Sequence, residues 1–417
     1  MEEKFTSRLS FIMASVGSAV GLGNLFRFPA LAVKYGGIFI PVYISLLALL
    51  GLPLLTCELA AGRYYQKSAV GCMGAISKKA RPLGWAASAN SFIIMSYYCL
   101  LFSFVLLASL FSFRLNAANA DSLFLDYISP KGGFPFDTQL LLAAAWGAVI
   151  LCYGRAENLG KISTVSVLFS VGVILVIALI RGISCPRALA VFLRPDPAPL
   201  LQPSFWADAL GQVFFSLSVG VGVMFAYGSF LRDGESIPLC GGIIAAIDLL
   251  VSLAATVIYA SVGPTGDDGL LLTCFSVYPK AFMDIFGSLG RWVCGLFYLS
   301  LALLCLASVF SYLKSAASAA GPPKTEPKRA SIIALAAAGI GLIMLIDEGL
   351  RLLHLTDSLA ARYLTLTVGL FEFIIFGYLA PPELISSARG GRGRGNLFYF
   401  LLKIFCPAAL IFLILSS

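Results

Sequence analysis

Residues 17–29 read Gly-Ser-Ala-Val-Gly-Leu-Gly-Asn-Leu-Phe-Arg-Phe-Pro and interrupt the first apolar stretch of the chain. In hydrocarbon each unpaired backbone N–H or C=O group is costly, so a broken helix is tolerated only where protein or a water-filled cavity satisfies the freed groups. Gly17 and Gly21 have the spacing of a helix-packing motif, and packing alone is the alternative interpretation. Packing does not account for Asn24 and Arg27 in the same span, because such side chains are costly in a membrane. We therefore expect a binding site at this break.

The composition indicates a polytopic membrane protein, since 59% of the 417 residues are apolar, 12% are charged and the mean hydropathy is +0.91. Apolar runs of about 20 residues bounded by charges predict eleven membrane spans. They lie near residues 10–32, 38–62, 84–112, 138–153, 162–181, 205–230, 238–262, 287–313, 330–346, 358–381 and 397–415.

The net charge of +8 comes mainly from Lys and Arg in loops that are cytoplasmic if the N-terminus is inside. Positively charged flanks resist translocation, so this arrangement predicts a multi-pass protein of the plasma (inner) membrane with a cytoplasmic N-terminus. The C-terminus is then extracellular or periplasmic. No nucleic-acid partner is expected, because the basic residues do not gather on one soluble domain.

The ten cysteines lie mainly within predicted spans and lack the Cys/His spacing of a metal site. The sequence also contains no paired carboxylates beside a nucleophile or metal motif. An enzyme and an organic cofactor are therefore not expected.

A second glycine-rich interruption, Phe214–Gly222, lies in the middle of the sixth span. Interrupted segments at matching positions of two halves indicate the midplane site of a secondary transporter, and an odd number of spans per half inverts the repeats. We expect one integral domain with a first five-helix repeat at 1–181, an extracellular loop at 182–203, a second, inverted five-helix repeat at 204–381, and a cytoplasmic loop with the eleventh helix at 382–417.

Four ordered motifs resemble the neurotransmitter:sodium symporter family, in particular its LeuT-type bacterial amino-acid transporters. They are Ser18–Pro29 followed by Gly36-Gly37, Cys57–Tyr64, Gly211–Ser218 and Gly369–Glu372. The resemblance implies an all-α polytopic membrane protein with the LeuT-like fold. Its eleven transmembrane helices would form two inverted five-helix repeats plus one extra helix, with the first and sixth helices broken.

The resemblance also implies a substrate site at the two breaks. Half-helix N-termini suit a carboxylate, whereas unwound carbonyls suit an ammonium group or a cation. Gly21 stands where monoamine-transporting relatives have an Asp, so a substrate with its own carboxylate, an amino acid, is expected. Tyr98 matches the family tyrosine whose hydroxyl reaches that carboxylate, and Tyr97 is the alternative. The implied substrate-binding residues are Ala19, Gly21, Leu22, Gly23, Ile94, Tyr98, Phe215, Ser216, Ser218, Val221, Ser308 and Tyr312.

Four of these positions, Ile94, Phe215, Val221 and Tyr312, match the family's hydrophobic subsite, which favours a neutral, apolar or aromatic amino acid. The particular amino acid does not follow, because a methylene group discriminates by only about 1–3 kcal/mol in such pockets.

For a first sodium ion the resemblance implies the Ala19 carbonyl, the Asn24 amide oxygen, Ser216 and Asp248. Asp248 stands where the family has Asn. Ser252 stands where the archetype has a Glu that does the work of chloride in animal relatives. We expect Asp248 to supply the fixed negative charge, so that transport does not require chloride.

For a second sodium ion the resemblance implies Gly17, Val20, Leu304 and Ser308. Ala307 replaces a hydroxyl ligand there, so the expected number of ions, one or two, stays open.

Arg27 and Asp357, with Tyr98 and Phe215, resemble the family's outer gate, in which two charges approach when the cavity closes. An N-cap of the tenth span is the alternative for Asp357. At the inner gate, Glu2 and Pro322 replace the family's charged pair, so no latch is assigned.

The sequence thus predicts a sodium-coupled symporter that imports a neutral, hydrophobic or aromatic amino acid across the lipid bilayer by alternating access. A receptor or channel-like member on the same scaffold, which binds without coupled transport, is the alternative. The oligomeric state is not predicted.

Overall fold

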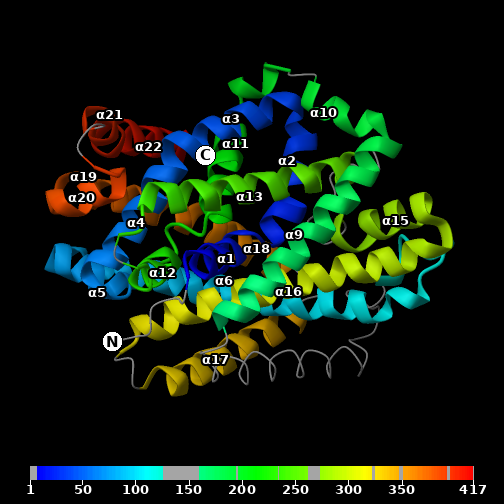
Figure 1. The fold of residues 1–417 in the computed structure, drawn as a ribbon, viewed down its shortest axis with the longest axis horizontal. Coiled ribbons are helices and arrows are strands. Elements are labelled where there is room, and N and C mark those ends of the chain that lie inside the picture. The colour runs from blue at the N-terminus through cyan, green and yellow to red at the C-terminus, as the bar shows by residue number, and fades with distance from the viewer. Residues whose placement is uncertain are drawn as a thin grey trace.

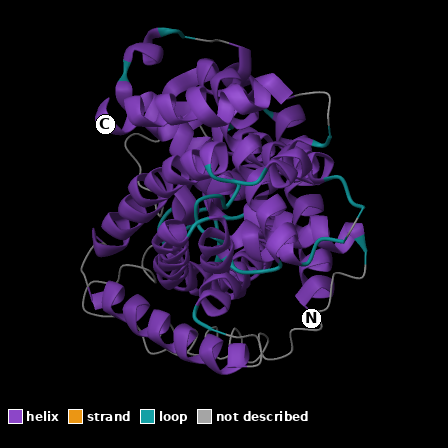
Figure 2. Cartoon of the chain, turned by 90° about the vertical axis from the view of Figure 1, so that its left-hand side faces the viewer, coloured by secondary structure: helices purple, strands orange, loops and turns teal. Residues whose placement is uncertain are grey.

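A computed structural model describes residues 7–124, 159–193, 196–232, 234–261, 273–321, 325–346, 351–391 and 395–416. Within these ranges the chain is helical and forms no strand (Figure 2). Two short non-helical segments, 20–21 and 217–222, are buried among the helices.

Eight helices of the described chain are long and apolar enough to cross a membrane. They coincide with eight of the eleven predicted spans. The predicted first and sixth spans are divided into shorter helices, and the predicted fourth span, 138–153, lies outside the described residues. The eight are Gly23–Tyr65, Lys78–Arg114, Ser163–Ser184, Ile237–Ala260, Phe275–Ala319, Glu326–Met344, Arg351–Tyr378 and Asn396–Leu413.

The principal α-helical segments follow the predicted order along the chain. They are α1 (Arg8–Ala19), α2 (Phe28–Tyr35), α3 (Phe39–Leu46), α4 (Leu52–Tyr65), α5 (Ala69–Ile76), α6 (Arg81–Phe111), α9 (Leu159–Ser184), α10 (Ala190–Leu193), α11 (Pro203–Ser216), α12 (Val223–Ser229), α13 (Ile237–Ala260), α15 (Tyr278–Phe286), α16 (Gly290–Ala319), α17 (Glu326–Ile346), α18 (Arg351–Asp357), α19 (Thr365–Tyr378), α20 (Pro382–Arg389), α21 (Gly395–Phe400) and α22 (Cys406–Ser416).

The long helices α6 and α16 lie side by side, with α17 next to them (Figure 1). The short helix α1 is enclosed by α9, α13 and α16, which explains why its residues from Phe11 to Ala19 are all buried. The half-helix α12 packs closely on α4: a Cβ added at Gly62 would lie 2.1 Å from the Phe225 carbonyl oxygen. The two broken spans therefore lie inside a frame of unbroken ones.

Five π turns interrupt the helices of the described chain. One of them, Ser358–Leu364, precedes no proline, and each of the other four ends two residues before a proline. Proline has no N–H to donate, and its ring clashes with the carbonyl four residues earlier. The wider i→i+5 turn relieves that clash by inserting one residue. These four turns are Gly23–Arg27 before Pro29, Leu47–Gly51 before Pro53, Thr273–Val277 before Pro279, and Leu401–Phe405 before Pro407.

Two parts of the chain contain helix that the span pattern did not anticipate. The segment predicted as an extracellular loop, 182–203, contains a 3-10 turn at Pro186–Leu189 and the short α10. Before α16 the chain forms α15, which ends at Phe286. The next residue, Gly287, has a φ of 52°. The division into two inverted repeats and the orientation in the membrane stay predictions.

Candidate substrate and sodium site

The first break lies between α1 and the π turn Gly23–Arg27. Val20, after the last residue of α1, has an extended backbone with φ −78° and ψ 117°. The Asn24 side chain turns back toward the break, and its Oδ1 accepts a hydrogen bond from the Gly21 N–H at 3.0 Å. One N–H group that the break frees is thereby satisfied by the chain itself.

The second break separates α11 from α12. Ser218, Gly220 and Gly222 all have left-handed φ values, of 52°, 71° and 76°. Glycine adopts these values without a Cβ penalty. Gly220 and Gly222 therefore allow the non-helical backbone that separates the end of α11 from the start of α12. The Gly220 N–H donates to Glu58 Oε1 at 2.7 Å, so Glu58 accepts a hydrogen bond from a main-chain group that the break frees.

The two breaks lie against each other. Ser218 Oγ, in the second break, donates to the Ser18 carbonyl near the end of α1 at 2.8 Å. On the other side, Gln212 Nε2 of α11 donates to the Gly23 carbonyl at 3.0 Å. The main-chain groups of two segments about 200 residues apart in sequence thus share one buried polar region.

Asn24, Ser216 and Asp248 form the centre of this region. Asn24 Nδ2 lies 2.6 Å from Asp248 Oδ1 and 2.9 Å from Ser216 Oγ. Ser216 Oγ donates to the two carboxylate oxygens of Asp248, at 2.7 and 2.8 Å, and Ser252 Oγ lies 2.9 Å from Asn24 Nδ2. Asp248 is completely buried without a basic side chain among these partners. A buried carboxylate surrounded by oxygens is the donor set that a hard cation prefers.

Three of the four residues expected at the first sodium site are therefore in contact. The fourth, Ala19, is the buried last residue of α1. The orientation of Asn24 differs from the expectation, because its amide nitrogen faces Asp248 and its oxygen faces Gly21. The amide must turn over for Oδ1 to reach a cation beside Asp248.

Three of the four residues expected at the second sodium site, Gly17, Leu304 and Ser308, are in contact. Ser308 Oγ lies 3.1 Å from the Gly17 carbonyl and 3.2 Å from the Leu304 carbonyl, and Val20 follows at the end of α1. A Cβ added at Gly17 would lie 3.2 Å from the Ala307 methyl group. An apolar methyl group thus lines this place on the α16 side, next to the Ser308 hydroxyl.

A narrow pocket lies between the first break and the aromatic side chains that cover it. Its lining residues are Leu22, Gly23, Arg27, Tyr97, Tyr98, Leu101, Phe215 and Asp357. Only about 10 Å³ is open to the centre of a water molecule, which is space for about one water. The Phe215 ring would lie 2.9 Å from a Cβ at Gly23. Binding an amino acid here requires the aromatic side chains to move.

Tyr98 is at the centre of the aromatic cover. Its ring centroid lies 5.5 Å from that of Tyr312 and 6.2 Å from that of Phe215. Its hydroxyl would lie 3.5 Å from a Cβ at Gly21. Tyr97, the alternative, also lines the pocket, so the pocket itself does not separate the two.

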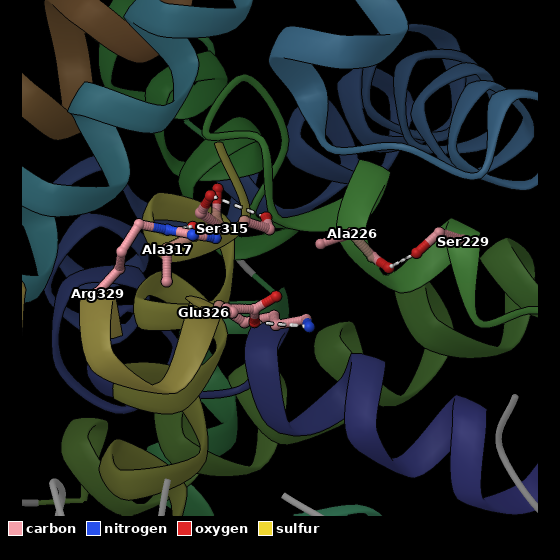
Figure 3. Close-up of polar contacts among 8 residues, drawn as sticks. Ala226, Ser229, Ser315, Ala317, Glu326 and Arg329 are labelled. Carbon is pink, nitrogen blue, oxygen red and sulfur yellow. Dashed lines mark hydrogen bonds and ion pairs between the residues drawn. The ribbon is translucent and has the colours of Figure 1, made fainter. Parts of the chain in front are cut away.

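The remaining expected pocket residues, Ile94 and Val221, are buried but do not line this pocket. The Val221 carbonyl accepts hydrogen bonds from Ser91 Oγ and from Ser315 Oγ, the latter at 3.0 Å (Figure 3). These bonds fix the second break against α6 and α16. Leu101 and Gln212 were not expected at the site, although Gln212 precedes Ser216 by one helical turn within the motif Gly211–Ser218.

The two charges expected at the outer gate, Arg27 and Asp357, line the same pocket without forming an ion pair within 4 Å in the described chain. The Arg27 guanidinium lies 5.9 Å from the centroid of the Phe215 ring. Asp357 ends α18 and a π turn continues from it, so the N-cap alternative is not what the structure has.

At the end of the bundle predicted to be cytoplasmic, described residues other than the expected pair make the polar contacts. Arg8 of α1 lies 3.3 Å from Glu235, and Lys314 of α16 lies 2.7 Å from Glu326 of α17. Arg329 donates to the Ala317 carbonyl at 3.2 Å (Figure 3). Glu2 and Pro322 lie outside the described residues.

Comparisons with known proteins agree with this arrangement. A family model described as the sodium:neurotransmitter symporter family matches residues 2–124 and 121–417. An uncharacterized sodium-dependent transporter of Methanocaldococcus jannaschii is 29% identical over 401 residues, covering 89% of this chain and 81% of the relative. The sodium-dependent neutral amino acid transporter B(0)AT3 of Mus musculus is 31% identical over 293 residues, covering 62% of this chain and 47% of the relative.

Among solved structures, the crystal structure of MhsT in complex with L-phenylalanine is similar with a TM-score of 0.90. The alignment covers 100% of both chains at 22% sequence identity. At this identity the likeness is one of fold.

Proposed function

This chain belongs to the sodium:neurotransmitter symporter family, and from that premise we propose that it is a sodium-coupled symporter that imports a neutral, apolar or aromatic amino acid. The observation that carries the proposal is the buried cluster of Asn24, Ser216 and Asp248 at the meeting point of the two breaks. It offers a cation a carboxylate and several oxygens beside the main-chain groups of the two breaks.

The substrate carboxylate binds at the start of the half-helix that follows Gly21. The N–H groups of Leu22 and Gly23 and the Tyr98 hydroxyl are its donors, and the half-helix dipole favours its charge. The absence of a side chain at Gly21 supports this assignment, since a Cβ there would lie 3.2 Å from Ser308 Oγ and 3.5 Å from the Tyr98 hydroxyl.

The ammonium group and the first sodium ion are held from the opposite side. Carbonyls at Ala19 and around Ser216 and Ser218 accept from the ammonium, and Asn24, Ser216 and Asp248 bind the ion together with the substrate carboxylate. Because Asp248 brings its own negative charge, transport proceeds without chloride. Gly17, Val20, Leu304 and Ser308 bind a second ion more weakly, since Ala307 supplies no hydroxyl.

The apolar side chain of the substrate occupies the subsite of Ile94, Phe215, Val221 and Tyr312, after Tyr312 and Phe215 have moved outward. The similarity to the mouse neutral amino acid transporter and to MhsT in complex with L-phenylalanine supports a neutral or aromatic amino acid. Arg27 and Asp357 then close over the occupied pocket with Tyr98 and Phe215, and release follows on the cytoplasmic side.

The test is flux. Proteoliposomes with an imposed sodium gradient should concentrate a labelled amino acid such as phenylalanine or leucine, and collapse of the gradient should release it. A receptor would bind the label without accumulation, and a channel would only equilibrate it. A panel of neutral, acidic and basic amino acids in the same assay, with sodium and with potassium, defines the substrate class and the coupling ion.

A further inference from the structure

The π turns before proline share a second feature. A proline removes the α-helical donor of the carbonyl four residues earlier, and a buried carbonyl without a donor is costly in a membrane protein. At three of the four turns a side chain from elsewhere in the fold donates to that carbonyl. The pairs are Tyr278 to Leu25 before Pro29, Cys406 to Leu49 before Pro53, and Tyr378 to Lys403 before Pro407.

The first of these pairs lies at the candidate site. Leu25 directly follows Asn24, and both belong to the π turn Gly23–Arg27. Tyr278 is the first residue of α15 and lies about 250 positions away in sequence. Its hydroxyl donates to the Leu25 carbonyl, so a distant helix contributes the hydrogen bond that Pro29 cannot make.

The Tyr278 ring is held by its surroundings. The side chain is completely buried. Its ring centroid lies 5.0 Å from that of Phe297, 5.8 Å from that of Phe26 and 6.2 Å from that of Phe282. Because the ring packs against three other rings, its hydroxyl has a fixed direction and can hold the Leu25 carbonyl in one position.

The same π turn is held on its other sides by the site itself. Gln212 of α11 donates to the Gly23 carbonyl, and Asn24 reaches Asp248 of α13. Gly23, Asn24 and Asp248 are among the residues expected to bind substrate or sodium, so we expect both contacts to change when those ligands enter. Among these three contacts, the Tyr278 hydrogen bond alone involves no proposed ligand.

We propose that Tyr278 is a positioning residue for the first sodium site: its hydroxyl substitutes for the missing Pro29 N–H and holds the π turn in the register that directs Asn24 toward Asp248. The proposal rests on the proposed function only in identifying the ion. It predicts that sodium affinity depends on a hydroxyl that touches neither ion nor substrate.

The experiment compares Tyr278→Phe with Tyr378→Phe in the purified full-length protein. Each variant deletes one hydroxyl that donates to the carbonyl four residues before a proline, but Tyr378 lies at the far end of α19 and is exposed. We expect Tyr278→Phe to raise the sodium concentration for half-maximal substrate binding by about threefold to tenfold, as for the loss of one buried hydrogen bond. Tyr378→Phe should leave it within a factor of two.

A double-mutant cycle with Pro29→Ala makes the test specific. Alanine at position 29 restores an N–H group that can donate to the Leu25 carbonyl, so the Tyr278 hydroxyl becomes dispensable. In the Pro29→Ala background, Tyr278→Phe should change the sodium half-saturation by less than about twofold. Because the comparison is made within one background, it stays valid if Pro29→Ala itself shifts the affinity.

The outcomes separate this proposal from the proposed function. If the wild-type protein binds no amino acid in a sodium-dependent manner, the proposed function is wrong. If the wild type is sodium-dependent but Tyr278→Phe only lowers the unfolding temperature at unchanged sodium half-saturation, Tyr278 is structural and the positioning role is wrong. An equal effect of Tyr278→Phe in both backgrounds also overturns it. If Tyr278→Phe does not fold, we expect the double variant Pro29→Ala/Tyr278→Phe to fold, because the N–H group that Pro29→Ala introduces replaces the Tyr278 hydroxyl as donor to the Leu25 carbonyl. A double variant that also fails to fold would contradict the proposal.

Discussion

Asn24 Nδ2 lies 2.6 Å from Asp248 Oδ1, and both side chains are completely buried. This contact joins the first break to the unbroken helix α13. Ser216, at the end of α11, hydrogen-bonds to both residues, so three separate segments meet at one carboxylate. A ligand that binds Asp248 therefore alters contacts of both broken spans at the same time.

Asn24→Ala should weaken sodium-dependent amino-acid binding. The change removes a ligand and leaves Asp248 with one donor fewer, and hydrogen bonds to charged groups are stronger than neutral ones, so the sodium half-saturation should rise by about tenfold or more. Scintillation proximity binding at varied sodium measures this. Asn90→Ala is the control, because Asn90 is equally buried but bonds to Thr365, 2.9 Å away. It should lower stability and leave sodium affinity unchanged. Equal sodium affinity in the wild type and in Asn24→Ala would contradict the first-site assignment.

Asp248→Asn should make transport depend on chloride. The substitution keeps the shape of the side chain and removes the fixed negative charge, so an external anion has to supply it. Uptake by the wild type should be the same in chloride and in gluconate, whereas uptake by the variant should fall by about fivefold or more in gluconate. The exposed Asp284→Asn is the matched control and should behave like the wild type. Loss of wild-type uptake in gluconate would refute chloride independence.

Ala307→Ser should strengthen the second sodium site. It places a hydroxyl beside Ser308 and against Gly17, where the structure has a methyl group. One more oxygen ligand should lower the sodium half-saturation by about threefold and raise the Hill coefficient for sodium. Ala302→Ser, a buried change on the same helix, should alter neither quantity. Identical Hill coefficients in the wild type and in Ala307→Ser would show that the missing hydroxyl does not limit this site.

Gly62→Ala should destabilise the protein strongly. The added Cβ would lie 2.1 Å from the Phe225 carbonyl oxygen and 3.0 Å from the Gly228 Cα, and backbone cannot yield as a side chain can. We expect a loss of about 3 kcal/mol or more in the free energy of unfolding. Gly172→Ala in α9 meets nothing within 4 Å and should be neutral or stabilising by about 0.5–1 kcal/mol. Thermal unfolding in detergent compares the two, and similar unfolding temperatures would contradict the close packing of α4 on α12.

The features that local sequence could predict are those written in adjacent residues. The glycines at 220 and 222 permit the left-handed backbone that the second break adopts, and eight of the predicted spans are continuous apolar runs. The resemblance to a known family supplied Asn24, Ser216 and Asp248, and the fold brings Asn24 into contact with the other two over separations of 192 and 224 residues.

The features that the sequence did not predict depend on contacts between distant segments. Nothing near Tyr278 or Gln212 indicates which carbonyl each one serves, because that is decided by the packing of α15 and α11 on the first break. The orientation of the Asn24 amide is likewise set by Gly21 on one side and Asp248 on the other. Four of the five described π turns were predictable in principle from the prolines, since each of the four ends two residues before one.

Each of those four π turns holds one residue more than an α-helix of the same length needs. Deleting a single residue there leaves the faces on either side unrotated, but the proline then clashes again with the carbonyl four residues earlier unless it is replaced as well. In the turn Leu47–Gly51, for example, a one-residue deletion would keep α3 and α4 presenting the same side chains to their neighbours. A single-residue deletion is therefore tolerable inside these membrane-spanning helices when the proline is replaced at the same time, and alignments should permit a single gap there where a relative lacks the proline.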